Sequence, residues 1–328
     1  MKSLTTRTYK LFVLSCVISI ALILGLYWAI NWGHHKLPKW ILEAGRDTTI
    51  TQKKSAKTCK NCHEKIFQAW KDGRHALAWN SETFIEDSEN RSKEKCLPCH
   101  IPEVVLAGEK PDSRIENRDE GIFCFSCHVK SEVMRGPYDL FSPPHPTKQD
   151  LNYRKSLYCS SCHVKTYKEW VNSGSKETCQ SCHMPRHRGR LVQKFPLHFL
   201  HTSKEVADHS VPAGRADEND LSLEARWLEN RLEITLENKG VPHGLPTADS
   251  GDPRLYLYLD ALSTDGKTLE QFKEILAPQQ ETALQFMQRR GFNFMLPPEV
   301  YKIAISIQIK QAWRKEKIEL LQKVLIHP

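Results

Sequence analysis

Apolar side chains are scarce in this chain of 328 residues. Hydrophobic residues make up 40% of the sequence, a low share for a chain long enough to form about two globular domains. Methionine is also rare, with five residues. The low apolar content means either that part of the chain is disordered or that something other than side chains fills part of the core.

Basic residues are abundant, but the chain has no basic stripe. Lys and Arg outnumber Asp and Glu and give a formal charge of +8 at pH 7. These residues are scattered along the sequence, whereas a nucleic-acid-binding surface clusters them on one face or along one helix. We therefore expect no nucleic-acid partner.

The N-terminal segment is the one long apolar run. Residues 1–10 carry three basic residues and no acidic residue, and residues 11–32 contain no charged side chain. A bilayer core of about 30 Å needs about 20 helical residues. The run ends in tyrosine and tryptophan, which suit a membrane interface, although a cleaved signal peptide remains the alternative. We expect residues 1–10 in the cytoplasm, a single-pass anchor at residues 11–32 in the cytoplasmic membrane, and the bulk of the chain on the periplasmic side.

The cysteines follow one pattern. Cys16 lies inside the apolar run, where we interpret it as a small buried hydrophobic residue. The other ten form five C-x-x-C pairs, each followed directly by histidine, and C-x-x-C-H is the attachment signature of c-type haem. Two thiols must form thioethers at one edge of the ring while the imidazole reaches the iron, and positions i, i+3 and i+4 of a helical turn share a face. The pairs are Cys59 and Cys62, Cys96 and Cys99, Cys124 and Cys127, Cys159 and Cys162, and Cys179 and Cys182, followed by His63, His100, His128, His163 and His183.

Other uses of paired cysteines fit this pattern less well. Zinc sites, disulfides and redox dithiols do not require histidine at the next position. Histidine is 15 of 328 residues, so five chance occurrences are improbable. The sequence therefore predicts five covalently bound haem c groups, with the ten cysteines as thioether donors and the five histidines as proximal iron ligands. The propionates of these groups also account for the excess of Lys and Arg.

An internal repeat surrounds the first and fourth motifs. An aromatic residue and a tryptophan follow His63 and His163 at offsets of four and seven, which places both rings on one helix face. We expect these rings to pack against a haem; an ordinary amphipathic helix is the alternative. The two copies then differ, because the first continues to His75 where the second has Ser175.

Ten histidines outside the motifs are candidates for distal ligands. A lone histidine is more often a surface or core residue, but five haems raise the demand for ligands. Only Met134 and Met184 could replace histidine in this region, so mostly bis-histidine ligation and low reduction potentials are expected. His75 and His145 are the first candidates, His198 and His201 follow, and His243 ranks lower together with His187 and His209.

The five motifs occupy 125 residues, too few for an ordinary side-chain core around each haem. We expect short helices and loops wrapped around five haems after one transmembrane helix, and then a C-terminal all-β domain resembling a sandwich. Alternating runs such as Leu232–Leu236 and Ile303–Ile309 predict its strands. The expected organisation is a linker at 33–55, a pentahaem domain at 56–201, a junction at 202–220 and the β domain at 221–328.

Two segments resemble a known family. Cys59–Ala76 reads C-x-x-C-H-x3-F-x2-W-x4-H-A and Gly121–His128 reads G-I-x-C-x-S-C-H. Together they resemble the cytochrome c-554 class, which is related to hydroxylamine oxidoreductase, over roughly residues 56–165. The resemblance implies closely packed haem pairs, ligation by His75 of a haem other than that of its own motif, and in some members one five-coordinate haem. The segment Gly240–Thr247 is close to the G-H-x-x-P-T-G element of β domains appended to such cytochromes, with Ala248 where glycine is usual.

Electron transfer is the function that these features favour. We expect a donor in the membrane or linked to membrane quinol, and another cytochrome or a terminal reductase as acceptor. One alternative is an oxidoreductase that uses a five-coordinate haem on a small nitrogen or sulfur compound, but the sequence identifies no catalytic side chain. Another is quinol oxidation at the membrane surface near His34, His35 and Lys36. The β domain is expected to be a docking or packing module, or to contribute His243 to a haem.

Overall fold

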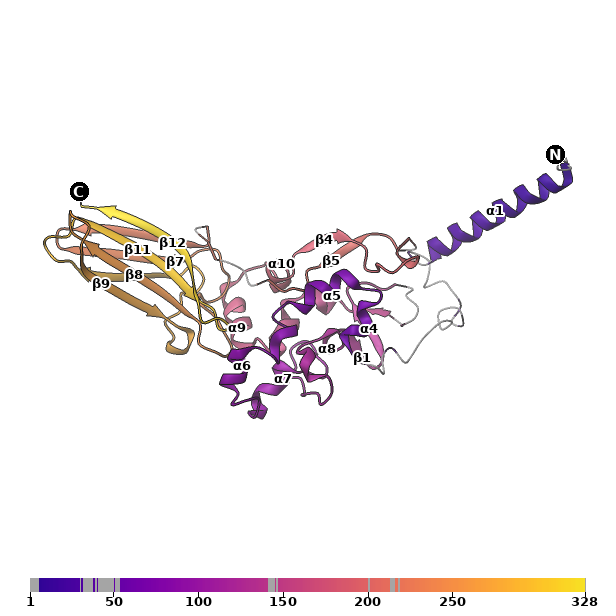
Figure 1. The fold of residues 1–328 in the computed structure, drawn as a ribbon, viewed down its shortest axis with the longest axis horizontal. Coiled ribbons are helices and arrows are strands. Elements are labelled where there is room, and N and C mark those ends of the chain that lie inside the picture. The colour runs from indigo at the N-terminus through magenta and orange to yellow at the C-terminus, as the bar shows by residue number, and fades with distance from the viewer. Residues whose placement is uncertain are drawn as a thin grey trace.

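The computed structural model places three parts in succession along the molecule. Figure 1 shows the N-terminal helix α1 extending from one end, the sheets of the C-terminal region at the other end, and short helices between them. The residues that the structure describes are 6–29, 31, 38, 40, 50, 54–140, 145, 147–199, 201–212, 216, 217 and 219–327.

Helix α1 spans Thr6–Trp28 and is apolar along most of its length. Its segment Thr8–Trp28 is long and apolar enough to cross a membrane, and none of that segment is buried against the rest of the protein. The expected apolar helix is therefore present. A membrane anchor and a signal sequence would both have this form.

The middle region, residues 54–212, consists of short elements because local caps interrupt the chain often. Ser55, Ser81 and Thr178 cap the N-termini of α4, α6 and α10 with their hydroxyl groups, and Gly174 ends α9 in the left-handed conformation. The helices are α4 (Ala56–Lys60), α5 (Glu64–Lys71), η3 (Ala76–Ala78), α6 (Glu82–Asp87), η4 (Glu94–Cys96), α7 (Leu97–His100), η5 (Arg118–Glu120), α8 (Cys124–His128), η6 (Leu151–Arg154), η7 (Ser156–Ser161), α9 (Val164–Ser173), α10 (Cys179–His183) and η8 (Leu197–Phe199). The strands are β1 (Val129–Lys130), β2 (Val133–Gly136), β3 (Thr147–Gln149), β4 (Arg186–Gly189) and β5 (Lys204–Ala207).

Close backbone contacts require two glycines in this region. A Cβ atom on Gly121, whose φ is +57°, would lie 2.5 Å from the carbonyl oxygens of His75 and Ala76. A Cβ atom on Gly73 would lie 2.7 Å from the Ser210 carbonyl oxygen. Both positions therefore need glycine, and both bring a histidine-bearing turn against the helices.

The segment 202–220, expected as a junction, is structured in its first half. Strand β5 pairs antiparallel with β4, with Val206 opposite His187. Val206 is buried, and the following turn carries His209. Residues 204–212 therefore belong to the middle region and not to a separate junction.

The C-terminal region contains two antiparallel sheets with a shared core. The strand orders are β10-β7-β6 and β12-β11-β8-β9. The predicted alternation is confirmed, because Leu232, Ile234 and Leu236 of β7 and Ile303 and Ile305 of β11 are fully buried in one cluster. The strands are β6 (Leu221–Leu228), β7 (Arg231–Asn238), β8 (Arg254–Leu262), β9 (Thr268–Leu276), β10 (Arg289–Met295), β11 (Lys302–Lys310) and β12 (Lys317–Ile326), and η9 (Pro278–Gln280) follows β9.

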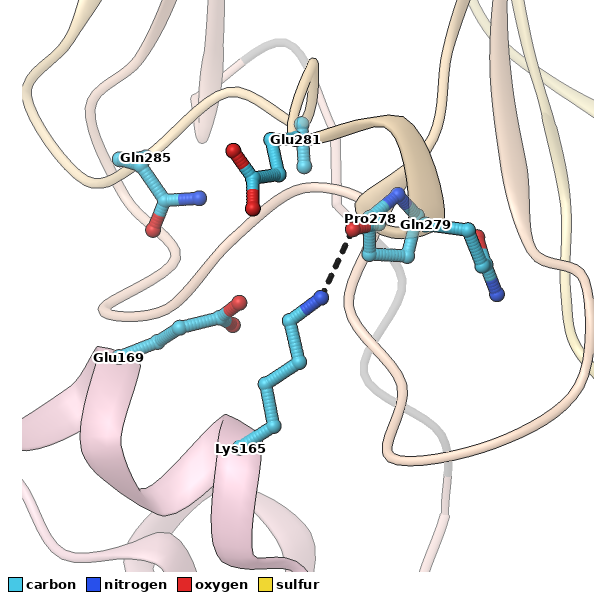
Figure 2. Close-up of a pocket in the computed structure, with 7 residues that line it drawn as sticks. Lys165, Glu169, Pro278, Gln279, Glu281 and Gln285 are labelled. Atoms are coloured by element: carbon cyan, nitrogen blue, oxygen red, sulfur yellow. Dashed lines mark hydrogen bonds between the residues drawn. The ribbon is translucent and has the colours of Figure 1, made fainter.

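Helix α9 carries the main contact between the middle and C-terminal regions. The Lys165 ammonium donates to the Pro278 carbonyl at 2.8 Å, and Glu169 accepts from the Gly244 amide and the Thr247 hydroxyl at 3.0 and 2.6 Å. Figure 2 shows Lys165 and Glu169 pointing from α9 toward the segment that contains Pro278. These bonds hold the loop after β7 and the turn η9 against α9.

Candidate haem-binding sites

Each C-x-x-C-H motif forms a helical turn. The His63 amide donates to the Cys59 carbonyl at 2.9 Å, and the His163 amide donates to the Cys159 carbonyl at 3.0 Å. The second motif runs from the last residue of η4 through α7, and the third and fifth motifs form α8 and α10. The turn therefore places both cysteines and the histidine within one helical turn, as thioether attachment requires.

Four of the five motif histidines use Nδ1 in the same way. Nδ1–H donates to a backbone carbonyl at 2.7 Å in three of them: His63 to Leu191, His100 to Ala78, and His128 to Arg135. From His183 it donates to the Pro212 carbonyl at 3.2 Å. A carbonyl can only accept, so the proton lies on Nδ1 and Nε2 is left with its lone pair for a metal.

Three of these histidines face a second imidazole. The ring centroids are 6.2 Å apart for His63 and His145, 6.1 Å for His128 and His209, and 6.4 Å for His183 and His243. Two imidazoles that bind one iron from opposite sides, with metal–nitrogen bonds of about 2 Å, place their centroids about 6 Å apart. The spacing therefore fits an iron atom between each pair.

The imidazoles that face the motif histidines, those of His145, His209 and His243, also have features of metal ligands. Nδ1–H of His209 donates to the Ala207 carbonyl at 2.8 Å, and that of His243 donates to the Gly244 carbonyl at 3.0 Å. His145 Nδ1 is buried without a hydrogen-bond partner, a state that a bond to iron would relieve. Burial lowers the pKa of His145 and of His128 to about 4, so both imidazoles are neutral near pH 7 and keep a lone pair for a metal.

His75 lies near the fourth motif. It is in the turn that follows α5, at the N-terminus of η3, and its carbonyl accepts from the Ile122 amide at 2.8 Å. Burial, with smaller effects of His163 and His209, lowers its pKa to about 4. His163 is thus one of the two imidazoles whose charge acts on His75.

The second motif has different surroundings. The Phe84 ring stacks on His100 with centroids 3.8 Å apart and an interplanar angle of 14°. Within the described part of the chain, no ring contact joins His100 to a second imidazole. Two further candidates are His198, which packs against Phe195 and Phe199, and His201, whose pKa is lowered by burial and, to a smaller extent, by the charge of His63.

The two copies of the repeat have the same local structure. On α5 the rings of Phe67 and Trp70 are 5.6 Å apart, and on α9 those of Tyr167 and Trp170 are also 5.6 Å apart. Phe67 and Trp70 pack against the small buried cluster that contains Phe123 and Phe125. The aromatic pair therefore lies on one helix face in both copies, as predicted.

Cysteines of different motifs contact one another. The Cys124 thiol, with burial, raises the pKa of Cys59. Contacts with the sulfur atoms of Cys99 and Cys179 raise the pKa of Cys162 and Cys159, respectively, and burial adds to both shifts. The first motif thus lies near the third, and the fourth lies near the second and the fifth.

The comparisons with known proteins agree with the motifs. Residues 58–129 match the model of the family described as cytochrome c554 and c-prime. The fold resembles the crystal structure of a penta-haem cytochrome c552 from Thermochromatium tepidum, with a TM-score of 0.61 and 18% identity over 83% of this chain and 98% of that chain. The chain is a multihaem c-type cytochrome with an additional C-terminal domain.

Two further solved structures share only slight similarity with this cytochrome. An endonuclease/exonuclease/phosphatase from Beutenbergia cavernae aligns at 11% identity over 43% of this chain and 34% of its own, with a TM-score of 0.20. A calcium-binding mutant of Bacteroides uniformis beta-glucuronidase 2 aligns at 15% identity over 32% of this chain and 12% of its own, with a TM-score of 0.18. No curated protein matches the sequence of this cytochrome.

Sequence reasoning gives His209 a low rank among the distal candidates, yet its ring lies opposite His128. No residue pattern within Asp208–Ser210 indicates this placement. The one available signal is Gly73, whose backbone lies close to the carbonyl oxygen of Ser210. A glycine in the sequence does not say which segment approaches it, so this signal has meaning only when the fold is known.

Proposed function

We propose that this cytochrome binds five haem c groups, one at each C-x-x-C-H motif, and transfers electrons between redox partners outside the cytoplasm. Haem supplies a reversible one-electron couple between ferric and ferrous iron when it is bound. The observation that carries the proposal is the set of three imidazole pairs at 6.1–6.4 Å. Two protein ligands leave no open iron position, which favours electron transfer over reaction with a substrate.

The ligand assignment follows these pairs. We assign His145, His209 and His243 as the distal partners of His63, His128 and His183. His75 is assigned to His163, because the two imidazoles that act on His75 are those of His163 and His209, and His209 is paired with His128. This assignment agrees with the expectation that His75 serves a motif other than its own, and it leaves His198 and His201 as weaker candidates.

In this assignment the C-terminal region supplies a ligand. Asn238, at the end of β7, is fully buried, and its amide Nδ2 lies within hydrogen-bond distance of the carbonyls of Val241, His243 and Leu284. Its Oδ1 accepts from the Val241 amide at 3.0 Å. These bonds fix the loop that presents His243 to His183, so the region is more than a docking module.

The contacts between motifs support a continuous series of redox centres. Figure 1 shows α4 and α8, which carry parts of the first and third motifs, nearer to α1, and α9 and α10 nearer to the C-terminal sheets. Motif cysteines contact one another within both groups. The chain's role is to hold neighbouring attachment sites close enough for electrons to pass between partners at the two ends.

We further propose that α1 anchors the protein in the cytoplasmic membrane, with a membrane or quinol-linked donor and another cytochrome or a terminal reductase as acceptor. The amide and hydroxyl of Thr202 each donate to Asn31 Oδ1 at 3.0 Å, which ties the residues after α1 to the segment beside His201. Because the His201 imidazole lies near that of His63, this contact supports a position of the first motif close to the membrane. The quinol-oxidation alternative involves His34, His35 and Lys36, which lie outside the described residues.

A second candidate function rests on His100. Because no imidazole among the described residues faces this ring, the iron at the second motif would have an open position for a small nitrogen or sulfur compound. Ring stacking by Phe84 and the bond from Nδ1–H to the Ala78 carbonyl hold His100 in place with Nε2 left for an iron.

One set of measurements tests both candidates. Intact mass of protein matured in a host that attaches haem c should correspond to five haems per chain. Addition of carbon monoxide to the reduced protein should leave bis-histidine haems unchanged and should bind at most one haem, that of the second motif. A mass without haem would contradict the proposal, and carbon monoxide binding with substrate turnover at one haem would favour the enzyme.

A further inference from the structure

His163 differs from the other four motif histidines in the group that faces Nδ1. The other four donate to uncharged backbone carbonyls at 2.7–3.2 Å. His163 Nδ1 instead lies 3.7 Å from Oδ2 of Asp249, a carboxylate from the loop between β7 and β8. The fourth motif therefore has a formal negative charge behind its proximal imidazole.

The Asp249 carboxylate is fixed in this position because each of its two oxygens accepts a hydrogen bond. Oδ1 accepts from the Lys165 backbone amide at 2.5 Å, and Oδ2 accepts from the Thr166 hydroxyl at 3.1 Å. Both donors belong to the first turn of α9, directly after His163, and the Asp249 side chain is 20% exposed. The Lys165 ammonium is engaged by the Pro278 carbonyl, on the side shown in Figure 2. The loop thus holds its charge against the base of the motif.

The fourth motif also occupies a central place among the motifs. Its Cys162 lies near Cys99 of the second motif, its Cys159 lies near Cys179 of the fifth, and Cys127 of the third is near both. A change in the redox properties of this centre would therefore affect exchange with three others.

We propose that Asp249 is a positioning residue that orients His163 and lowers the reduction potential of the iron that His163 binds. The inference rests on the proposed ligation by His163. A negative charge behind the imidazole strengthens it as a donor and favours ferric over ferrous iron, which carries one positive charge less. The C-terminal region thereby sets the redox property of the central site as well as contributing a ligand.

Replacing Asp249 by Asn tests the effect of the charge, because the side chain keeps its shape and its amide oxygen can still accept the bond from the Lys165 amide, while the NH2 group can donate to the Thr166 hydroxyl. In a potentiometric titration of the full-length holoprotein, one of five midpoint potentials should shift to a more positive value and four should stay in place. Asp249→Glu, which keeps the charge, should return that midpoint toward the wild-type value. Asp252→Asn is the matched control, since Asp252 lies in the same segment but pairs with Arg254 and Lys310.

The outcomes separate this inference from the proposed function. Five haems with unchanged midpoints in Asp249→Asn would overturn the role of Asp249 and leave the electron-transfer proposal intact. Equal shifts in the Asn and Glu variants would show a packing effect and overturn it as well. If Asp249→Asn does not mature, Thr166→Val removes one of the two bonds that fix the carboxylate and should shift the same midpoint in the same direction by less. Failure to attach haem in the wild type would instead contradict the proposed function.

Discussion

The middle and C-terminal regions form their cores by different means. The C-terminal sheets bury a large continuous cluster of aliphatic side chains, drawn from β7, β8 and β11 among other strands. In the middle region, the corresponding cluster consists of Ala56, Phe123, Phe125 and Val129 with a few partly buried neighbours. The first is an ordinary hydrophobic core, whereas the second is too small to offset the entropy of ordering the chain. The low apolar content of the sequence therefore reflects a region whose core we assign to the cofactor.

The largest expected effect comes from withholding haem. Protein made without haem attachment should have an unfolded middle region and folded C-terminal sheets, because cofactor binding supplies the folding free energy of the former. Limited proteolysis followed by mass spectrometry should cut within residues 54–212 and spare most of 219–327. Equal protection of both regions without haem would show that the middle region has a sufficient core of its own.

The converse experiment removes a buried aliphatic side chain from the core of the C-terminal sheets. Ile305 is fully buried in β11, so Ile305→Ala should destabilise that region by about 2–5 kcal/mol. Denaturant unfolding followed by the fluorescence of Trp227, the tryptophan on β6, should show the loss, and the haem count should stay the same. Exposed Val324 in β12 provides the control, because Val324→Ala should change stability by less than about 0.5 kcal/mol.

The same contrast explains what the sequence could and could not predict. Local signals indicated the motifs, the repeat with Trp70 and Trp170, and the alternating strands, because each depends on nearby residues. The imidazole pairs join residues far apart in the chain, such as His128 with His209, and depend on tertiary folding. His243 ranked low among the candidates, and its loop belongs to the C-terminal region, yet the contacts of α9 bring that loop to His183.

A pair of variants sharpens the ligand assignment. His209→Ala should leave haem attachment intact and make one haem high-spin and reactive toward carbon monoxide, since the ring opposite His128 is lost. His198→Ala should leave the carbon monoxide response unchanged, because His198 packs against Phe195 and Phe199. Optical and electron paramagnetic resonance spectra of the two reduced and oxidised proteins provide the measurement. The reverse result would support the original ranking of His198.

The smallest expected effect concerns a charged pair in the middle region and its dependence on pH. Lys130 and Asp150 are 3.2 Å apart with side chains 15% and 16% exposed, and the ammonium lies 5.4 Å from the Tyr153 ring centroid. Burial raises the pKa of Asp150, but bonds from the Asn152 amide and from Lys130 outweigh it and lower the pKa below the ordinary value. A carboxyl group with a lowered pKa in the folded state adds stability above its unfolded pKa, and that stability is lost as the pH falls through the folded pKa.

Asp150→Asn should therefore cost about 1–2 kcal/mol at pH 7. The cost should shrink as the pH falls below about 4, where the unfolded carboxyl takes up a proton, and should be lost as the pH falls through the lowered pKa of the folded carboxyl. Urea unfolding of the holoprotein at both pH values, followed by absorbance of the haem groups, measures the difference. Glu224→Gln in the exposed ion pair with Arg289 of the C-terminal sheets is the comparison, and should cost less than about 1 kcal/mol at pH 7. An Asp150→Asn effect independent of pH would assign the loss to the altered cap of η6, whose first turn Asp150 caps through Asn152, and not to the charge.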